Sequence, residues 1–168
     1  MKILDWLCQR PDGLGHLTEE ERESAISFAL LWMYFEARLV HTEANAEALI
    51  NLVSRLAQTV SLDVQQVLDC YDYFRERYWN EGGPSNYVAG LRMTNALAGD
   101  VLPRLENPPD PRGKLIACML IILRYRNNLF HGNKWLYGLE GQRENFAQAT
   151  QLLLTVIALD DSVRDHPY

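Results

Sequence analysis

The chain has 168 residues, of which 48% are hydrophobic and 23% charged, an ordinary composition that indicates one globular domain. Its formal net charge of -6 gives no long-range attraction to nucleic acid. The three cysteines, Cys8, Cys70 and Cys118, are far apart in the sequence, which argues against a disulfide framework and a zinc ribbon. We expect free thiols in a reducing compartment.

The sequence carries no signal for a membrane. Asp5 and Arg10 interrupt the stretch where a signal peptide needs an apolar core, and the longest apolar run, Leu115 to Leu123, is about half a membrane span. We therefore expect a cytoplasmic protein with a single domain over residues 1–168 and its core at about 18–160.

Helical periodicity dominates the first half of the chain. Thr18 and Glu21 form a capping box ahead of a helix at about 19–39, which is apolar over most of its circumference. Such a helix is central or lies in a subunit interface. Apolar residues three and four apart predict two more helices, at about 43–60 and 61–79.

The second half begins with a predicted turn at 80–86 and a shorter, irregular helix at about 85–98, and Pro103 should end or kink any continuation of that helix. Asp110 and Pro111 are typical of a helix start, and this helix should run to about Asn128. A last helix is expected at about 142–159. Because no segment alternates with period two, we predict an all-α bundle of five or six helices.

The stretch RYRNNLFHGNKW, residues 124–135, gathers two arginines, three asparagines, a histidine and a lysine within a region, Pro111 to Leu139, that has no Asp or Glu. On a continuous helix Arg126 and His131 lie about 140° apart, so they converge only if the helix ends between them. From physical chemistry alone, a capped helix end is the simpler interpretation. In it His131 and Lys134 cap carbonyls, and Arg126 pairs with an acid on a neighbouring helix.

Arg126, the polar Asn127 and His131, followed by Gly132, resemble the Arg-x4-6-His motif of the HEPN superfamily, and the phrase RNNLFHGNK is similar to small stand-alone bacterial members. That family places the motif near the end of a long helix in an all-α domain of this size. The branch paired with nucleotidyltransferase antitoxins has a Tyr two positions after the His, where this chain has Asn133.

The resemblance implies a metal-independent endoribonuclease without cofactors, acting as a homodimer whose two motifs face each other. Histidine can move protons near neutral pH, and arginine offers phosphate a fixed fork of donors. We therefore expect His131 and Arg126 to be catalytic and Asn127 to orient one of them. The remaining polar residues of the motif are expected to bind flanking RNA phosphates: Arg124, Asn128 and Lys134.

The nuclease would be a toxin or an antiviral defence effector, controlled by an antitoxin or another regulator. The alternative is a non-catalytic HEPN-like module that binds nucleotides, RNA or a protein. A homodimer is also expected from packing, since a lone bundle has difficulty covering both the first apolar helix and the run Leu115 to Leu123.

Overall fold

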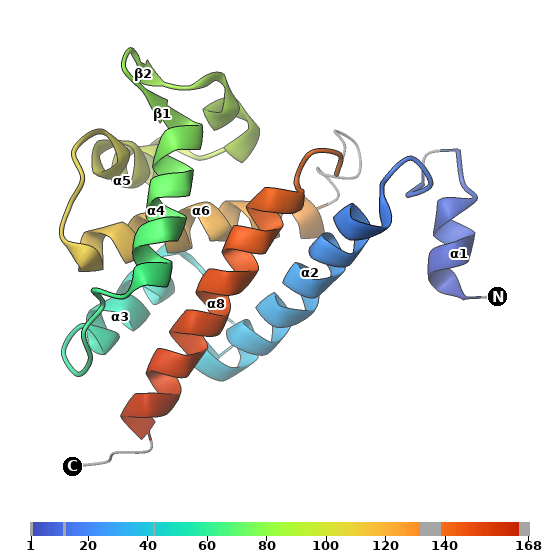
Figure 1. The fold of residues 1–168 in the computed structure, drawn as a ribbon. Coiled ribbons are helices and arrows are strands. Elements are labelled where there is room, and N and C mark those ends of the chain that lie inside the picture. Colours follow the sequence, from blue (N-terminus) through green and yellow to red (C-terminus); the bar gives the residue numbers. More distant parts are fainter. Residues whose placement is uncertain (1, 12, 42, 132–138, 165–168) are drawn as a thin grey trace.

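Helices form nearly all of the regular structure in the computed structural model, which describes residues 2–11, 13–41, 43–131 and 139–164 (Figure 1). The elements in chain order are α1 (Ile3–Cys8), α2 (Glu19–Leu39), α3 (Ala46–Leu56), α4 (Gln65–Tyr78), β1 (Trp79–Asn80), β2 (Gly83–Pro84), the 3-10 helix η1 (Asn86–Leu91), α5 (Asn95–Glu106), α6 (Pro111–Phe130) and α8 (Arg143–Arg164). The prediction of an all-α bundle is confirmed. None of the described helices combines the length and apolarity needed to cross a membrane.

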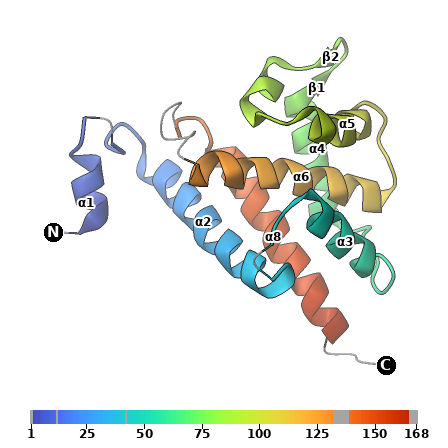
Figure 2. The same cartoon turned by 180° about the vertical axis from the view of Figure 1, so that it is seen from behind.

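Helix α6 is the centre of the bundle. It crosses behind α4 and α8 in Figure 1, and the view from behind shows α2 and α3 on the same side of it (Figure 2). Every residue from Leu115 to Leu123 is buried, which the helices of one chain achieve without a partner. For α2, where Leu30 and Met33 are exposed, the expected difficulty of covering both apolar surfaces remains, whereas the bundle covers this run by itself. The reason is that α3, α4 and α5 pack around α6 on different sides.

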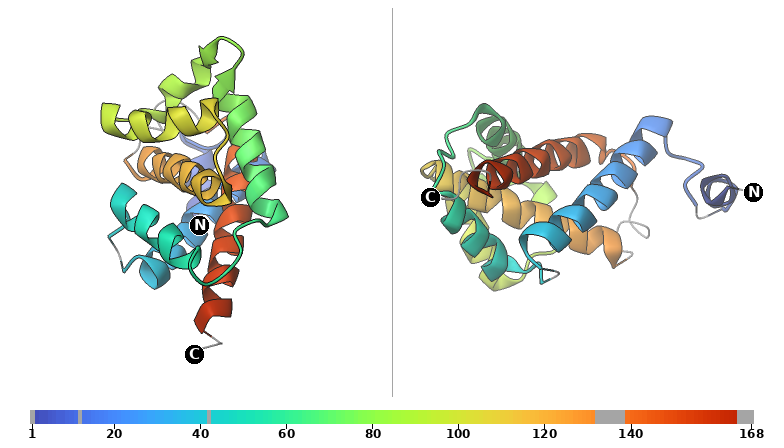
Figure 3. Two further views of the ribbon diagram at one scale, coloured as in Figure 1. Left: turned by 90° about the vertical axis from the view of Figure 1, so that its left-hand side faces the viewer. Right: turned by 90° about the horizontal axis from the view of Figure 1, so that it is seen from below.

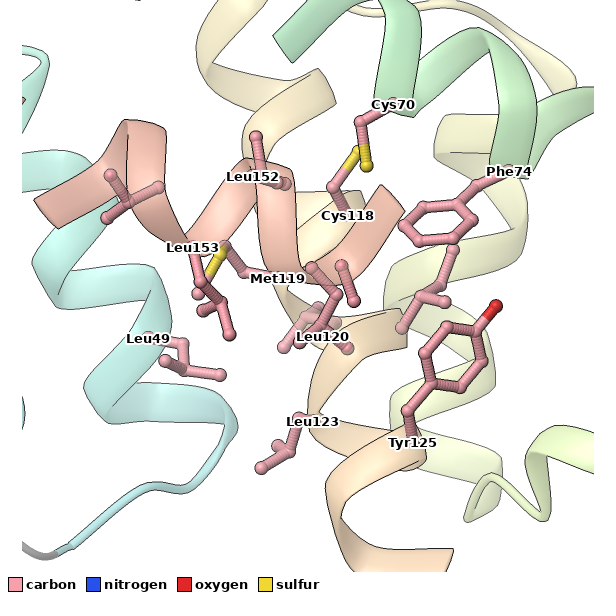
Figure 4. Packing of buried hydrophobic residues seen from close by; sticks show 14 of the residues in the cluster. Leu49, Cys70, Phe74, Cys118, Met119, Leu120, Leu123, Tyr125, Leu152 and Leu153 are labelled. Carbon is pink, nitrogen blue, oxygen red and sulfur yellow. The ribbon is translucent and has the colours of Figure 1, made fainter. Parts of the chain in front are cut away.

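Helices α2 and α8 lie side by side and run in the same direction (Figure 3). The Ser24 hydroxyl donates to the Arg143 carbonyl near their first turns at 3.0 Å, and Arg38 pairs with Asp161 near their last turns. Phe28 of α2 stacks on Phe146 of α8 with ring centroids 5.1 Å apart. Side chains from α3, α4, α6 and α8 interlock in the same core, where the thiols of Cys70 and Cys118 are buried and free (Figure 4).

Caps explain where several helices begin. The Thr18–Glu21 capping box is present, and the Asp110 carboxylate accepts a 2.8 Å hydrogen bond from the Gly113 amide at the start of α6. Helix α1 was not expected. It contains no buried residue and stands apart from the bundle in Figures 1 and 2 and in the right-hand view of Figure 3.

The predicted helix at about 85–98 is instead two elements. Arg92 has a φ of 51°, a left-handed conformation that ends η1, and the Thr94 hydroxyl then caps α5. Helix α5 also continues through Pro103 to Glu106, because Val101 and Leu105, one turn apart, are both fully buried. Burial of this stripe outweighs the hydrogen bond that proline cannot donate.

Candidate functional site

The end of α6 carries the residues that the sequence singled out. The helix stays α-helical through Phe130, and the backbone amide of His131 donates to the Asn127 carbonyl at 3.0 Å. His131 is thus the C-cap residue, and its side chain is exposed. Gly132, Asn133 and the candidate phosphate ligand Lys134 lie outside the described residues.

Arg126 is fixed by neighbours on two helices. Its Nη2 donates to both carboxylate oxygens of Glu36 on α2, at 3.0 and 3.1 Å, and its Nη1 donates to the Asn127 Oδ1 at 3.0 Å. Its guanidinium carbon lies 5.9 Å from the Trp32 ring centroid and 5.7 Å from that of Phe130. The arginine is therefore held in one orientation between two aromatic rings before any ligand arrives.

Glu36 is in turn held by α2 itself. The Trp32 indole Nε1 donates to its Oε2 at 2.8 Å, and only 14% of the Glu36 side chain and 26% of the Arg126 side chain are exposed. The sequence analysis did not single out Glu36, although the capped-helix interpretation predicted that Arg126 pairs with an acid on a neighbouring helix. The available signal was that Glu36 is the only acid between Glu23 and Glu43, in a helix that is otherwise apolar on that side.

Arg126 and His131 do not converge within one chain. Because α6 stays helical up to His131, a step of about 100° per residue leaves the two side chains about 140° apart. Arg126 faces α2, whereas His131 lies nearer the side of α6 that carries Arg124 and Asn128. Within one chain, His131 is therefore not on the side of α6 that carries Arg126.

Arg124 and Asn128 hold η1 against α6. The Arg124 Nε donates to the Leu91 carbonyl at 2.9 Å, and the Asn128 amide donates to the Gly90 carbonyl at 3.1 Å. Burial lowers the pKa of Arg124, and the positive charge of Arg92 lowers it further. Asn128 is only 1% exposed, so a phosphate has no access to it in this conformation, and its contacts are those of a structural residue.

Two further cations of the acid-free region, Arg112 and Lys114, lie away from this site. Arg112 donates to the Ser54 hydroxyl at 2.9 Å, and the Lys114 ammonium lies 5.3 Å from the Tyr71 ring centroid, both near the start of α6. A helix of this length separates its ends by about 30 Å, so the basic stretch in the sequence is not one basic patch in space.

An exposed apolar stripe on α2 lies beside the Arg126–Glu36 pair. Its residues recur at helical spacing, and their exposed fractions are 36% for Ile26, 62% for Leu30, 57% for Met33 and 53% for Tyr34. Helical geometry puts Met33, one turn before Glu36, on the edge of the stripe nearest that carboxylate. The stripe is what the sequence predicts for a helix that contributes to a subunit interface.

Comparisons with protein-family models, with curated proteins and with solved structures found no match for this chain. Within the described part of the chain, no three His, Cys, Asp or Glu side chains gather as a metal ion would require.

Proposed function

We propose that the chain is a metal-independent endoribonuclease, similar in its motif to the HEPN superfamily, whose active site forms between two copies of the chain. The observation that carries the proposal is the guanidinium of Arg126, which is locked by Glu36 and Asn127 about one helical turn before an exposed histidine. A preoriented fork of N–H donors is what a developing phosphorane charge requires.

The second copy supplies what one chain lacks. Since Arg126 and His131 diverge on α6, a complete site needs the two motifs to meet across a two-fold axis. The apolar stripe of Ile26, Leu30 and Met33 flanks Arg126 and offers the surface on which a second copy would pack. Both motifs then face one shared cleft.

The reaction needs no water and no metal. The RNA 2′-oxygen attacks the adjacent phosphorus while its proton passes to a base, the 5′-oxygen leaves and takes a proton from an acid, and a 2′,3′-cyclic phosphate remains. His131 serves as base or acid, and the two copies of the site provide one histidine for each proton transfer. Arg126 stabilises the equatorial phosphorane oxygens, and the RNA phosphate competes with Glu36 for its guanidinium.

Cleavage of single-stranded RNA in EDTA tests the proposal. We expect 2′,3′-cyclic phosphate ends from RNA and no cleavage of DNA, which lacks the 2′-hydroxyl nucleophile. His131→Ala should abolish cleavage, and Arg126→Lys should impair it severely because the charge remains but the fork is lost. His41→Ala, outside the motif, is the matched control and should cleave normally. Inhibition by EDTA, or full activity of His131→Ala, would refute the mechanism.

The second candidate is a non-catalytic module that binds RNA, nucleotides or a protein. The observation in its favour is that Glu36 already neutralises Arg126, in a chain whose net charge is -6. Wild-type protein that binds RNA without cutting it would establish this function. The role as a toxin or defence effector has its own readout, since expression of wild type but not of His131→Ala should arrest growth.

A further inference from the structure

The two longest stretches of the sequence without an acid lie against each other in the fold. One is Pro111 to Leu139, and the other is Gly82 to Gly99, which contains η1. They are joined where Arg124 and Asn128 of α6 donate to the backbone carbonyls of Gly90 and Leu91. The two longest segments without carboxylates thus pack together in a chain that has 22 acidic residues.

An arginine and an exposed tyrosine stack at the start of η1. The Arg77 guanidinium carbon of α4 lies 4.4 Å from the ring centroid of Tyr87, and 5.9 Å from that of Tyr78 on its own helix. Tyr87 is 60% exposed, whereas Tyr78 is buried. The cation therefore braces one face of the Tyr87 ring, and much of the remaining ring surface meets solvent.

The tyrosine is positioned by the backbone around it. The Ser85 hydroxyl donates to the Arg77 carbonyl at 2.6 Å and accepts a hydrogen bond from the Tyr87 amide at 3.3 Å. The Ser85 amide also donates to the Tyr78 carbonyl at 2.9 Å. These bonds fix the start of η1 to the end of α4, so the ring is preoriented and loses little conformational freedom when a ligand stacks on it.

Positive charge continues at the other end of η1. Arg92 is exposed at the C-cap, close enough to Arg124 that its charge lowers the pKa of that guanidinium. The 3-10 helix separates Tyr87 from Arg92 by about 10 Å. His131 lies nearer the side of α6 that contacts η1 than the side that faces α2. Tyr87, Arg92 and the proposed catalytic histidine are therefore on the same side of α6.

We propose that Tyr87, braced by Arg77, is a stacking platform for a base of single-stranded RNA, and that Arg92 and Arg124 attract the phosphates between this base and the cleavage site. The inference deepens the proposed function and rests on it for the identity of the ligand. Aromatic rings bind bases of any sequence, and arginines near them hold the backbone, which together suit a strand rather than a folded duplex.

Binding is measured with a DNA oligonucleotide of ten thymidines, which the nuclease cannot cleave but whose bases stack in the same way. Fluorescence anisotropy should show a dissociation constant roughly tenfold higher for Tyr87→Ala, while Tyr87→Phe binds like wild type because the ring is kept. For RNA cleavage, Tyr87→Ala should raise KM by a similar factor and leave kcat unchanged, since the ring does not touch the reacting atoms.

Trp6 supplies a matched control. Its ring is exposed and lies 5.2 Å from the Arg10 guanidinium carbon, but it belongs to α1, far from η1 (Figure 1). Trp6→Ala should therefore bind like wild type. The platform would be overturned if Tyr87→Ala bound the oligonucleotide as tightly as the wild type, or if Trp6→Ala lost as much affinity as Tyr87→Ala.

The outcomes separate this inference from the proposed function. If the wild type cleaves RNA and Tyr87→Ala has the same KM as the wild type, the platform is refuted and the nuclease is not. Tyr87-dependent binding of the oligonucleotide without RNA cleavage supports the platform and refutes the nuclease. If the wild type neither binds the oligonucleotide nor cleaves RNA, both the platform and the nuclease are refuted.

Discussion

Glu36→Gln is the most direct perturbation of the candidate site. Glutamine keeps the size of the side chain and can still accept the Trp32 indole hydrogen bond, which is 2.8 Å long in the native protein. It removes the negative charge that binds the Arg126 Nη2 through two oxygens at 3.0 and 3.1 Å. The substitution therefore removes the charge and one of the two acceptor oxygens from the contact between α2 and α6, and keeps the packing of the side chain.

The size of the effect depends on burial. Exposed ion pairs contribute about 0 to 1 kcal/mol, whereas removing one partner of a fully buried pair costs about 3 to 5 kcal/mol. With 14% of Glu36 and 26% of Arg126 exposed, the pair lies between these limits. We expect the free energy of unfolding to fall by about 2 kcal/mol, which lowers Tm by about 4 to 8 °C in a domain of this size.

Thermal unfolding followed by circular dichroism at one fixed protein concentration measures this change. Glu20→Gln is the matched control, because the Glu20–Arg143 pair joins α2 to α8 at 3.2 Å but its side chains are 68% and 61% exposed. It should leave Tm unchanged. If Glu36→Gln lowers Tm no more than Glu20→Gln, the claim that Glu36 holds Arg126 in place is wrong.

Two further predictions concern assembly and pH. Light scattering at micromolar concentration should give about twice 19.3 kDa for wild type. Leu30→Glu should give the mass of the monomer, because it places a charge in the apolar stripe of α2. Tyr87→Glu is the control and should remain dimeric, since Tyr87 is as exposed as Leu30 but lies on η1. Burial raises the pKa of Tyr71 to about 12, whereas an unfolded tyrosine ionises near 10. As pH rises, the unfolded state therefore loses the Tyr71 proton first, so the free energy of unfolding should decline from about pH 10 to 12. Urea titrations should show a smaller decline for Tyr71→Phe. A pH profile identical to that of the wild type would contradict this.

Local sequence rules determined most of the helices. The Thr18–Glu21 box and the Asp110–Pro111 pair mark the starts of α2 and α6 correctly, because a cap depends only on residues within one turn. The same rules also indicated a polar cluster at the end of the most apolar stretch, with Arg126 and His131 as its members.

Tertiary structure decided which contacts each of those residues makes. Glu36 is 90 positions from Arg126, and no periodicity links the two, so the ion pair depends on how α2 crosses α6. The same packing buries Asn128 under η1 and carries α5 through Pro103. Local propensity failed at these points because burial of apolar surface, which involves residues distant in sequence, contributes more free energy than the preference of a single residue.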